Sequence, residues 1–153
     1  MAEHGIVLVA HNIRSLWNIG SFFRTADAFG VKHIHLTGYT ASPPREEIHK
    51  TALGADEWIP WSQDLSPLEV LSRRKKEGYE VVSLEITSGS VPIGTFKPKK
   101  PVCLVVGHEV TGVPPEILAA SDAIVHIPMI GKKESLNVSV ALGIALFSLL
   151  ECS

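Results

Sequence analysis

Three segments of the chain combine polar side chains with glycine at spacings that suit ligand binding. The first covers residues 18–26 and contains Gly20 and Arg24, four residues apart. On a helix this spacing places both residues on one face, so a ligand could approach the backbone at Gly20 beneath the Arg24 guanidinium. Asn18 is expected to cap this helix. A capped helix with an ordinary surface arginine is an equally weighted alternative.

The second segment, VVGHEVTG, holds one carboxylate in a turn between Gly107 and Gly112. Open α/β sheets bind ligands at the carboxyl ends of their strands, and this turn follows an apolar strand. Glu109 is therefore expected to accept hydrogen bonds from a ligand or to orient Arg24. Taken alone, the segment slightly favours the alternative of a tight turn with an exposed glutamate.

The third segment, residues 127–141, reads IPMIGKKESLNVSVA and joins a strand to a long apolar helix. Ser135 or Asn137 is expected to cap that helix. Asn137 and Ser139 are polar residues entering an apolar run, and buried polar groups need hydrogen-bond partners. They are expected to bond to backbone, to a ligand or to one another. Simple capping explains Ser135 better than it explains Asn137.

Several common ligand motifs are missing from the sequence. There is no GxGxxG after the first strand, no P-loop around Gly131 and Lys132, and no GxSxG elbow. These absences argue against a dinucleotide-binding oxidoreductase, a P-loop nucleotidase and a serine hydrolase. His33 and His35 alternate on a probable strand, and the histidines show no metal-ligand spacing. We expect structural or surface histidines and no metal.

The elements that must position these segments alternate between strands and helices. Strands are predicted at residues 6–10, 32–36, 57–60, 80–85, 102–107 and 123–127. Helices are predicted near residues 18–29, 46–53, 67–77, 114–120 and 136–150, the third with Ser66 as its N-cap and Gly78 as its stop. Most strand candidates are continuous apolar runs, as in strands covered on both faces. The pattern predicts one α/β domain with a mostly parallel sheet.

Composition limits the kind of partner. The 153 residues are 45% hydrophobic and 20% charged, with a formal net charge of −2, which excludes a disordered chain and argues against nucleic-acid binding by bulk positive charge. Local basic patches remain. Arg14 and Lys132 lie beside motifs that favour contact with a ligand. The basic run at residues 73–76 is at least as well explained as a solvated helix face. Residues 97–100 contain three further lysines.

The sequence also suggests where the protein works. Cys103 and Cys152 have no partner motif, which fits a reducing cytoplasm. The N-terminus has no basic region followed by an apolar stretch, so no signal peptide is predicted. The most apolar segment, residues 138–150, is shorter than the roughly 20 residues of a membrane span and is expected to be a buried helix.

Taken together, the three segments resemble the SpoU (TrmH-like) RNA ribose 2′-O-methyltransferases of the SPOUT superfamily. The matches are NxGxxxRxA at 18–26, GxExxG at 107–112 and IPMxGxxxSLNVSVA at 127–141, in the family's order and across nearly the whole chain. The third is strong alone, and the ordered triplet is stronger. His108 stands where family members often carry asparagine.

This resemblance implies a C-terminal deep trefoil knot and S-adenosylmethionine as cofactor, with S-adenosylhomocysteine as product. The cofactor would lie between loops at residues 84–89, 107–112 and 127–137. The implied cofactor-binding residues are Leu84, Gly107, Glu109, Ile127, Met129, Ser135 and Leu136, with the backbone of Leu84, Gly107, Ile127 and Leu136 holding adenine and ribose and Met129 as an apolar wall. Family members are homodimers, and the helix at 138–150 would pack against its copy.

The resemblance also implies a catalytic centre at Arg24, surrounded by Asn18, Glu109, Ser135 and Asn137. A guanidinium with a pKa above about 12 is a poor proton acceptor. We therefore expect Arg24 to clamp the RNA phosphate and ribose, and the proton to leave through the phosphate or water.

The implied substrate is structured RNA, tRNA or rRNA, contacted by Arg14, Arg24 and Lys132. The 153 residues are expected to form a single methyltransferase domain without a separate RNA-binding domain, which favours compact tRNA. Two other classes are weighed. A non-catalytic RNA-binding or dimerisation module with the same fold would be expected to have lost Arg24, Asn18 or Asn137, and all three are present. An α/β enzyme for another nucleotide would need a phosphate-binding glycine loop.

Overall fold

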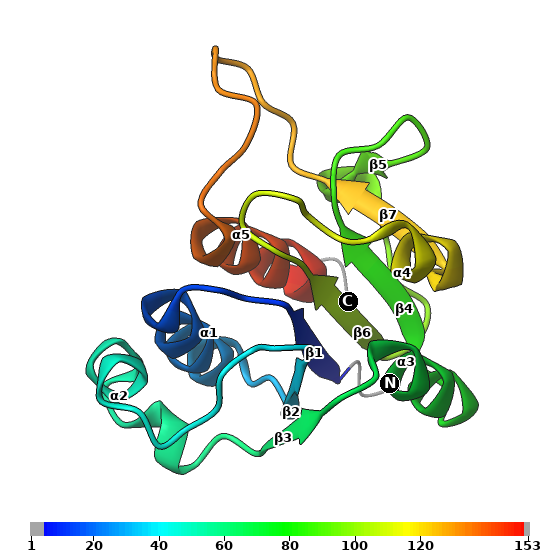
Figure 1. The fold of residues 1–153 in the computed structure, drawn as a ribbon. Coiled ribbons are helices and arrows are strands. Elements are labelled where there is room, and N and C mark those ends of the chain that lie inside the picture. The colour runs from blue at the N-terminus through cyan, green and yellow to red at the C-terminus, as the bar shows by residue number, and fades with distance from the viewer. Residues whose placement is uncertain (1–4, 152–153) are drawn as a thin grey trace.

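The computed structural model describes residues 5–151, and within them a single sheet is covered by helices on both faces (Figure 1). The strands are β1 Ile6–His11, β2 His33–Thr37, β3 Trp61–Asp64, β4 Glu80–Leu84, β5 Val91–Pro92, β6 Val102–Val106 and β7 Ala123–His126. The helices are α1 Leu16–Phe29, α2 Glu46–Ala52, α3 Pro67–Lys76, α4 Pro115–Ala120 and α5 Val138–Glu151, with short 3-10 turns η1 Ala55–Glu57 and η2 Ile93–Thr95.

The sheet has seven strands in the order β3-β2-β1-β6-β4-β7-β5, and every pairing in this part of the chain is parallel. The predicted α/β fold is confirmed. Side chains on β1 alternate between two cores: Ile6, Leu8 and Ala10 pack in the core under α1, α2 and α5, while Val7 and Val9 pack in the core under α3 and α4. This burial on both faces explains why the strand candidates read as continuous apolar runs.

The predicted strand at residues 57–60 is wrong, and β5 was not predicted. Residues 55–57 form η1 instead, because Leu53 and Gly54 both have positive φ (51° and 94°) and turn the chain after α2. Pro60 has no N–H for a ladder, so β3 begins at Trp61. The two residues of β5 at the sheet edge are too few to show any periodicity.

The helix ends show which caps were predicted correctly. Ser66 caps α3 by accepting a hydrogen bond from the Glu69 N–H at 3.3 Å, and Gly78 follows that helix with φ 96°, both as predicted. At α1 the predicted cap, Asn18, is wrong. The helix begins two residues earlier, and Ser15 caps it by accepting from the Asn18 N–H at 3.2 Å.

Gly20 packs two helices together and does not face a ligand. It is buried in α1 against α2, where a Cβ would overlap the Thr51 hydroxyl oxygen and the Ile48 carbonyl oxygen. The prediction that Gly20 and Arg24 together face a ligand is therefore wrong, although both lie on α1. Arg24 itself is exposed.

The paired histidines form part of a hydrogen-bonded network at the β2–β3 edge. Arg74 donates to His35 Nε2 from Nε at 3.2 Å, so His35 is neutral and donates from Nδ1 to Asp64 at 2.8 Å. His33 Nε2 lies 2.8 Å from the Ser62 hydroxyl. Burial, helped by the neighbouring His35 and Arg74, lowers the pKa of His33 to about 4. This network gives the histidines a structural role and turns Arg74 inward.

Two remaining sequence expectations concern cysteine and the membrane. Cys103 is buried with a free thiol, and burial raises its pKa to about 12, so it behaves as a small apolar side chain. Cys152 lies outside the described residues. Within residues 5–151, none of the helices combines the length and apolarity that a membrane crossing requires.

The tight contact at Gly20 predicts a stability cost for Gly20→Ala. The Thr51 hydroxyl can rotate away from a new Cβ, but the Ile48 carbonyl belongs to the α2 backbone and cannot. We expect a loss of about 1–3 kcal/mol in the free energy of unfolding, measured by chemical denaturation. Gly143→Ala in α5 is the control, since its Cβ would only approach the Thr25 Cγ2 at 3.8 Å. Equal stability of the two variants would contradict this packing role.

Candidate functional site

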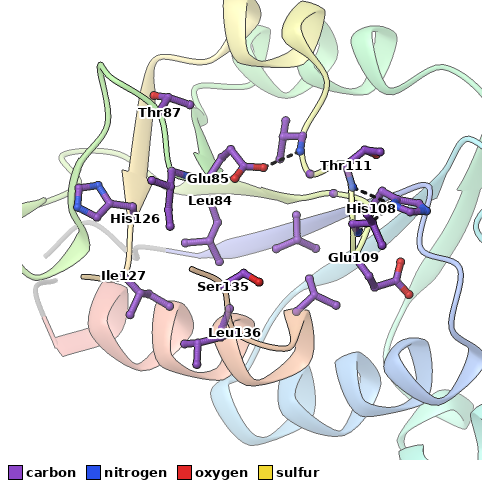
Figure 2. Close-up of a pocket in the computed structure, with 18 of the residues that line it drawn as sticks. Leu84, Glu85, Thr87, His108, Glu109, Thr111, His126, Ile127, Ser135 and Leu136 are labelled. Atoms are coloured by element: carbon purple, nitrogen blue, oxygen red, sulfur yellow. Dashed lines mark hydrogen bonds between the residues drawn. The ribbon is translucent and has the colours of Figure 1, made fainter. Parts of the chain in front are cut away.

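A cavity of about 420 Å³ lies at the carboxyl edge of the sheet, among the loops that follow β4, β6 and β7 (Figure 2). This volume lies in the range of small-ligand sites, roughly 300–1,000 Å³. The lining consists of residues 84–87, 106–113, 126, 127, 129, 135 and 136, with Leu118, Val138 and Ala141. The second and third sequence segments therefore meet at one cavity, together with the loop after β4.

The structure divides the predicted site residues into two groups. Those that line the cavity are Leu84, Gly107, Glu109, Ile127, Met129, Ser135 and Leu136. Those that do not line it are Arg14, Asn18, Arg24, Lys132 and Asn137. Lys132 is exposed on the long excursion between β7 and α5 that extends away from the body of the protein (Figure 1).

Glu109 holds the start of α1. Its carboxylate accepts hydrogen bonds from the N–H groups of Arg14 at 2.9 Å and Ser15 at 2.8 Å, and from the Asn18 side-chain amide at 3.3 Å. Burial alone would raise the pKa of Glu109, but these hydrogen bonds outweigh it and hold the pKa below its usual value. The carboxylate thus binds the two residues before α1 and Asn18 in its first turn, which differs from the expectation that it would orient Arg24.

Asn18 connects Glu109 to the third segment. Its side-chain oxygen accepts a hydrogen bond from the Asn137 amide at 3.4 Å, while its own amide donates to Glu109. Asn137 also caps α5, because its Oδ1 accepts from the N–H groups of Ser139 at 2.9 Å and Val140 at 3.3 Å. The preference for Ser135 over Asn137 as the capping residue is wrong. Side chains from all three sequence segments are joined in one hydrogen-bonded chain.

The turn between Gly107 and Gly112 needs both glycines. A Cβ on Gly107 would come within 2.5 Å of the Gly112 carbonyl oxygen, and Gly112 has φ 74°. His108 Nδ1 accepts from the N–H groups of Val110 at 3.0 Å and Thr111 at 3.1 Å. The two glycines and the His108 side chain therefore hold this turn in a compact conformation.

Glu85 is a cavity residue that the sequence reasoning missed. Its carboxylate accepts hydrogen bonds from the Val113 N–H at 2.9 Å and the Ile86 N–H at 2.9 Å, and Figure 2 shows it directed toward the loop after β6. Glu85 is the last residue of the strand predicted at 80–85, so the rule that selected Glu109, a carboxylate near the carboxyl end of a strand, also applies to Glu85. Two carboxylates line the cavity, and none of its described lining residues is lysine or arginine.

Arg24 lies on the α1 surface beside α5. Within residues 5–151 its guanidinium makes no hydrogen bond or ion pair. The next residue, Thr25, approaches Gly143 of α5, and Phe29 packs edge-to-face on Phe147 with ring centroids 6.5 Å apart. Three α5 side chains on the exposed surface, Val140, Ile144 and Phe147, are 51%, 40% and 57% exposed.

The protein has a parallel sheet with a cavity at its carboxyl edge, and the loops that line the cavity carry two of the three motifs. This arrangement is typical of α/β proteins that bind a ligand at the ends of their strands. The model of the SpoU rRNA Methylase family matches residues 5–147, so the chain belongs to that family. It is 34% identical over 146 residues to a tRNA (guanosine(18)-2′-O)-methyltransferase of Aquifex aeolicus, covering 95% of this chain and 68% of that protein.

Two further relatives point the same way. The chain is 32% identical to a 23S rRNA (guanosine-2′-O-)-methyltransferase RlmB of Nitrosomonas europaea, covering 96% of this chain and 56% of that protein. The crystal structure of an AdoMet-bound rRNA methyltransferase from Sinorhizobium meliloti superposes with a TM-score of 0.86 at 32% identity, covering 97% of this chain and 56% of that one. The chain thus spans little more than half the length of these two relatives.

The contacts of Glu109 predict a pH-dependent stability effect for Glu109→Gln. The variant loses the charged acceptor for α1, so we expect a loss of about 2 kcal/mol at pH 7. A carboxyl group with a depressed folded pKa stabilises the fold above its unfolded pKa and loses this effect as the pH falls through its folded pKa. The difference between wild type and variant should therefore shrink on acidification below about pH 4.5.

Denaturant unfolding at a series of pH values measures this difference, with the exposed Glu134→Gln as the matched control. A Glu109→Gln difference that stays constant from pH 7 to pH 3, or one no larger than that of the control, would show that the carboxylate charge is not what holds α1.

Proposed function

We propose that this chain is an S-adenosylmethionine-dependent methyltransferase that modifies the ribose 2′-hydroxyl of structured tRNA or rRNA and releases S-adenosylhomocysteine. The observation that carries the proposal is that the second and third motifs line one cavity at the carboxyl edge of the sheet, and that Asn18 of the first motif is hydrogen-bonded to Glu109 and Asn137. The family membership, and relatives named as tRNA and rRNA 2′-O-methyltransferases, support the same reaction.

The cavity fits this cofactor better than it fits a phosphate-bearing nucleotide. Glu85 and Glu109 line it without lysine or arginine among its described residues, which suits a sulfonium cation and opposes a polyphosphate. Leu84, Ile127, Met129 and Leu136 provide apolar walls for an adenine ring, with backbone groups at Leu84, Gly107, Ile127 and Leu136 to bind adenine and ribose. Ser135 adds a hydroxyl at the same rim. When bound, S-adenosylmethionine supplies an electrophilic methyl group.

The residues of this chain must then align the ribose oxygen and accommodate its proton. Arg24 is proposed to clamp the RNA phosphate and ribose, with Asn18, Glu109, Ser135 and Asn137 around the reacting centre. Glu109 serves there as a positioning residue, because its lone pairs already hold α1 and its pKa is lowered. The proton is proposed to leave through the RNA phosphate or water. Arg14 and Lys132, both exposed, would contact RNA.

A homodimer through α5 is part of this proposal. Val140, Ile144 and Phe147 follow one another at helical spacing and leave an exposed apolar stripe that a second copy would bury. Arg24 lies on α1 next to α5 and outside its own cavity, so dimerisation would place its guanidinium at the junction of two subunits. Two copies of each basic patch would also compensate for a net charge of −2 when RNA binds.

The C-terminal trefoil knot of the family is proposed for this chain as well. The adjacency of β6, β4 and β7, and the return of residues 127–137 to place Asn137 beside Asn18, support it. We further propose that residues 5–151 form one methyltransferase domain that works in the cytoplasm, where a free buried thiol such as Cys103 is stable.

Methyl transfer from a labelled cofactor tests the function. We expect label in tRNA or rRNA from a methylation-deficient strain, on a ribose 2′-oxygen mapped by resistance to alkaline cleavage. In calorimetric titrations S-adenosylhomocysteine should bind, whereas ATP and NAD should not. Binding of ATP without S-adenosylhomocysteine would point to an enzyme for another nucleotide. RNA binding without cofactor binding would indicate a non-catalytic module.

The proposed role of Arg24 predicts a separation of transfer from cofactor binding. Arg24→Ala should lower methyl transfer at least about 100-fold, the usual effect of losing a group that stabilises the transition state, while the S-adenosylhomocysteine Kd stays within about twofold. Arg24→Lys should stay well below wild type because lysine cannot grip two oxygens at once. Arg45→Ala, at another exposed arginine, is the control. An Arg24→Ala enzyme with most of its activity would rule out this role.

A further inference from the structure

An exposed aromatic ring lies at the rim of the cavity, and the proposed reaction does not account for it. Tyr39 follows β2 and is 60% exposed. Its ring meets the His108 ring edge-to-face, with centroids 6.5 Å apart and planes at 81°. His108 lines the cavity, so the two rings continue its wall outward (Figure 2 shows His108 at the rim).

The loop that carries Tyr39 is held rigidly. The Tyr39 N–H donates to Asn12 Oδ1 at 3.0 Å, and the Ile13 N–H donates to the Thr40 hydroxyl at 3.0 Å. That hydroxyl in turn donates to the Ala10 carbonyl at 3.0 Å. Asn12 itself has φ 54°, an uncommon conformation for a residue with a side chain. These bonds fix the backbone of residues 12–13 alongside 39–40, so less loop entropy is lost when a ligand binds there.

The His108 side chain has two roles, one in hydrogen bonding within the turn and one in packing against Tyr39. Its Nδ1 accepts from the N–H groups of Val110 and Thr111, which keeps the turn closed. A side-chain amide oxygen at this position would satisfy the same two donors. What the imidazole adds is a ring, and that ring packs against Tyr39. The aromatic pair is therefore separable from the turn.

A cation completes the surface. Arg14 is exposed and follows Ile13, which the Thr40 hydroxyl binds, and its backbone N–H is held by Glu109. An exposed aromatic ring that packs on a residue of a small-ligand cavity, with an exposed arginine on the neighbouring loop, has the chemistry that binds an unpaired nucleotide: the base can stack on the ring and a phosphate can meet the cation. A paired base has both faces covered and cannot stack there.

We propose that Tyr39, backed by His108, is a stacking platform for an unpaired RNA base beside the cavity, with Arg14 on an adjoining phosphate. The inference rests on the proposed function and specifies its substrate as a nucleotide in a loop or bulge. Tyr39 acts as a positioning residue and takes no part in methyl transfer.

The test compares Tyr39→Ala, Tyr39→Phe and His108→Asn with wild type, using unmodified bulk tRNA as the RNA probe. Loss of one stacked base predicts at least about a fivefold rise in the KM for tRNA in Tyr39→Ala. kcat at saturating RNA and the S-adenosylhomocysteine Kd should remain within about twofold. Tyr39→Phe keeps the ring and should restore the wild-type KM, whereas His108→Asn keeps the turn but removes the backing ring and should show an intermediate KM.

The control is Leu65→Ala, which removes an apolar side chain that is 86% exposed and does not line the cavity. A fully paired RNA duplex should bind Tyr39→Ala and wild type equally. An unchanged KM in Tyr39→Ala would overturn the platform while wild-type methylation still upheld the proposed function. A weakened cofactor Kd in Tyr39→Ala, or failure of Tyr39→Phe to restore the KM, would overturn it in favour of a purely structural tyrosine.

Discussion

The carboxylate of Glu109 at the start of α1 is the contact on which the rest of the site depends. It accepts hydrogen bonds from the backbone N–H groups of Arg14 and Ser15, which lead into the helix, and it places negative charge at the positive end of the helix dipole. Asn18 extends this contact to Asn137, and Asn137 caps α5. One network thus sets where two helices begin relative to the cavity, and displacement of any member would shift the others.

This arrangement separates charges of opposite sign. The carboxylates of Glu85 and Glu109 are part of the cavity wall, whereas the free guanidinium of Arg24 lies outside on α1. An anion would be repelled by the wall and attracted to the surface around Arg24, and a cation would meet the opposite conditions. These placements support the proposal of a site for a cationic cofactor beside a surface for a polyanion, even in a protein with a small negative net charge.

How much of this could be read from the sequence depended on the distance over which each feature acts. The α3 cap at Ser66 was predictable, because Pro67 in the first turn and Gly78 after the last mark both ends of that helix in the sequence. The start of α1 was not, because Ser15 and Asn18 are both suitable cap residues and no proline marks the first turn. The boundary of β3 was not, because its register depends on β2. The α5 cap at Asn137 is local, because its acceptors serve N–H groups two and three residues on, and the sequence named Asn137 as one of two candidates. Its bond to Asn18 spans 119 residues and has no local pattern. Gly20 was misjudged for the same reason, since the helix that requires it is α2.

The proposed reaction releases the proton of the ribose 2′-hydroxyl, and none of the residues proposed for the reacting centre is a good general base for it. Glu109 is a weak base because three donors already hold its oxygens and its pKa is lowered. A guanidinium is a weaker base still. Asn18, Ser135 and Asn137 accept hydrogen bonds without taking protons at neutral pH. The chemistry assigned to these residues is therefore alignment of a hydroxyl with an electrophile and exclusion of competing geometries, and the RNA phosphate or solvent is left to carry the proton away.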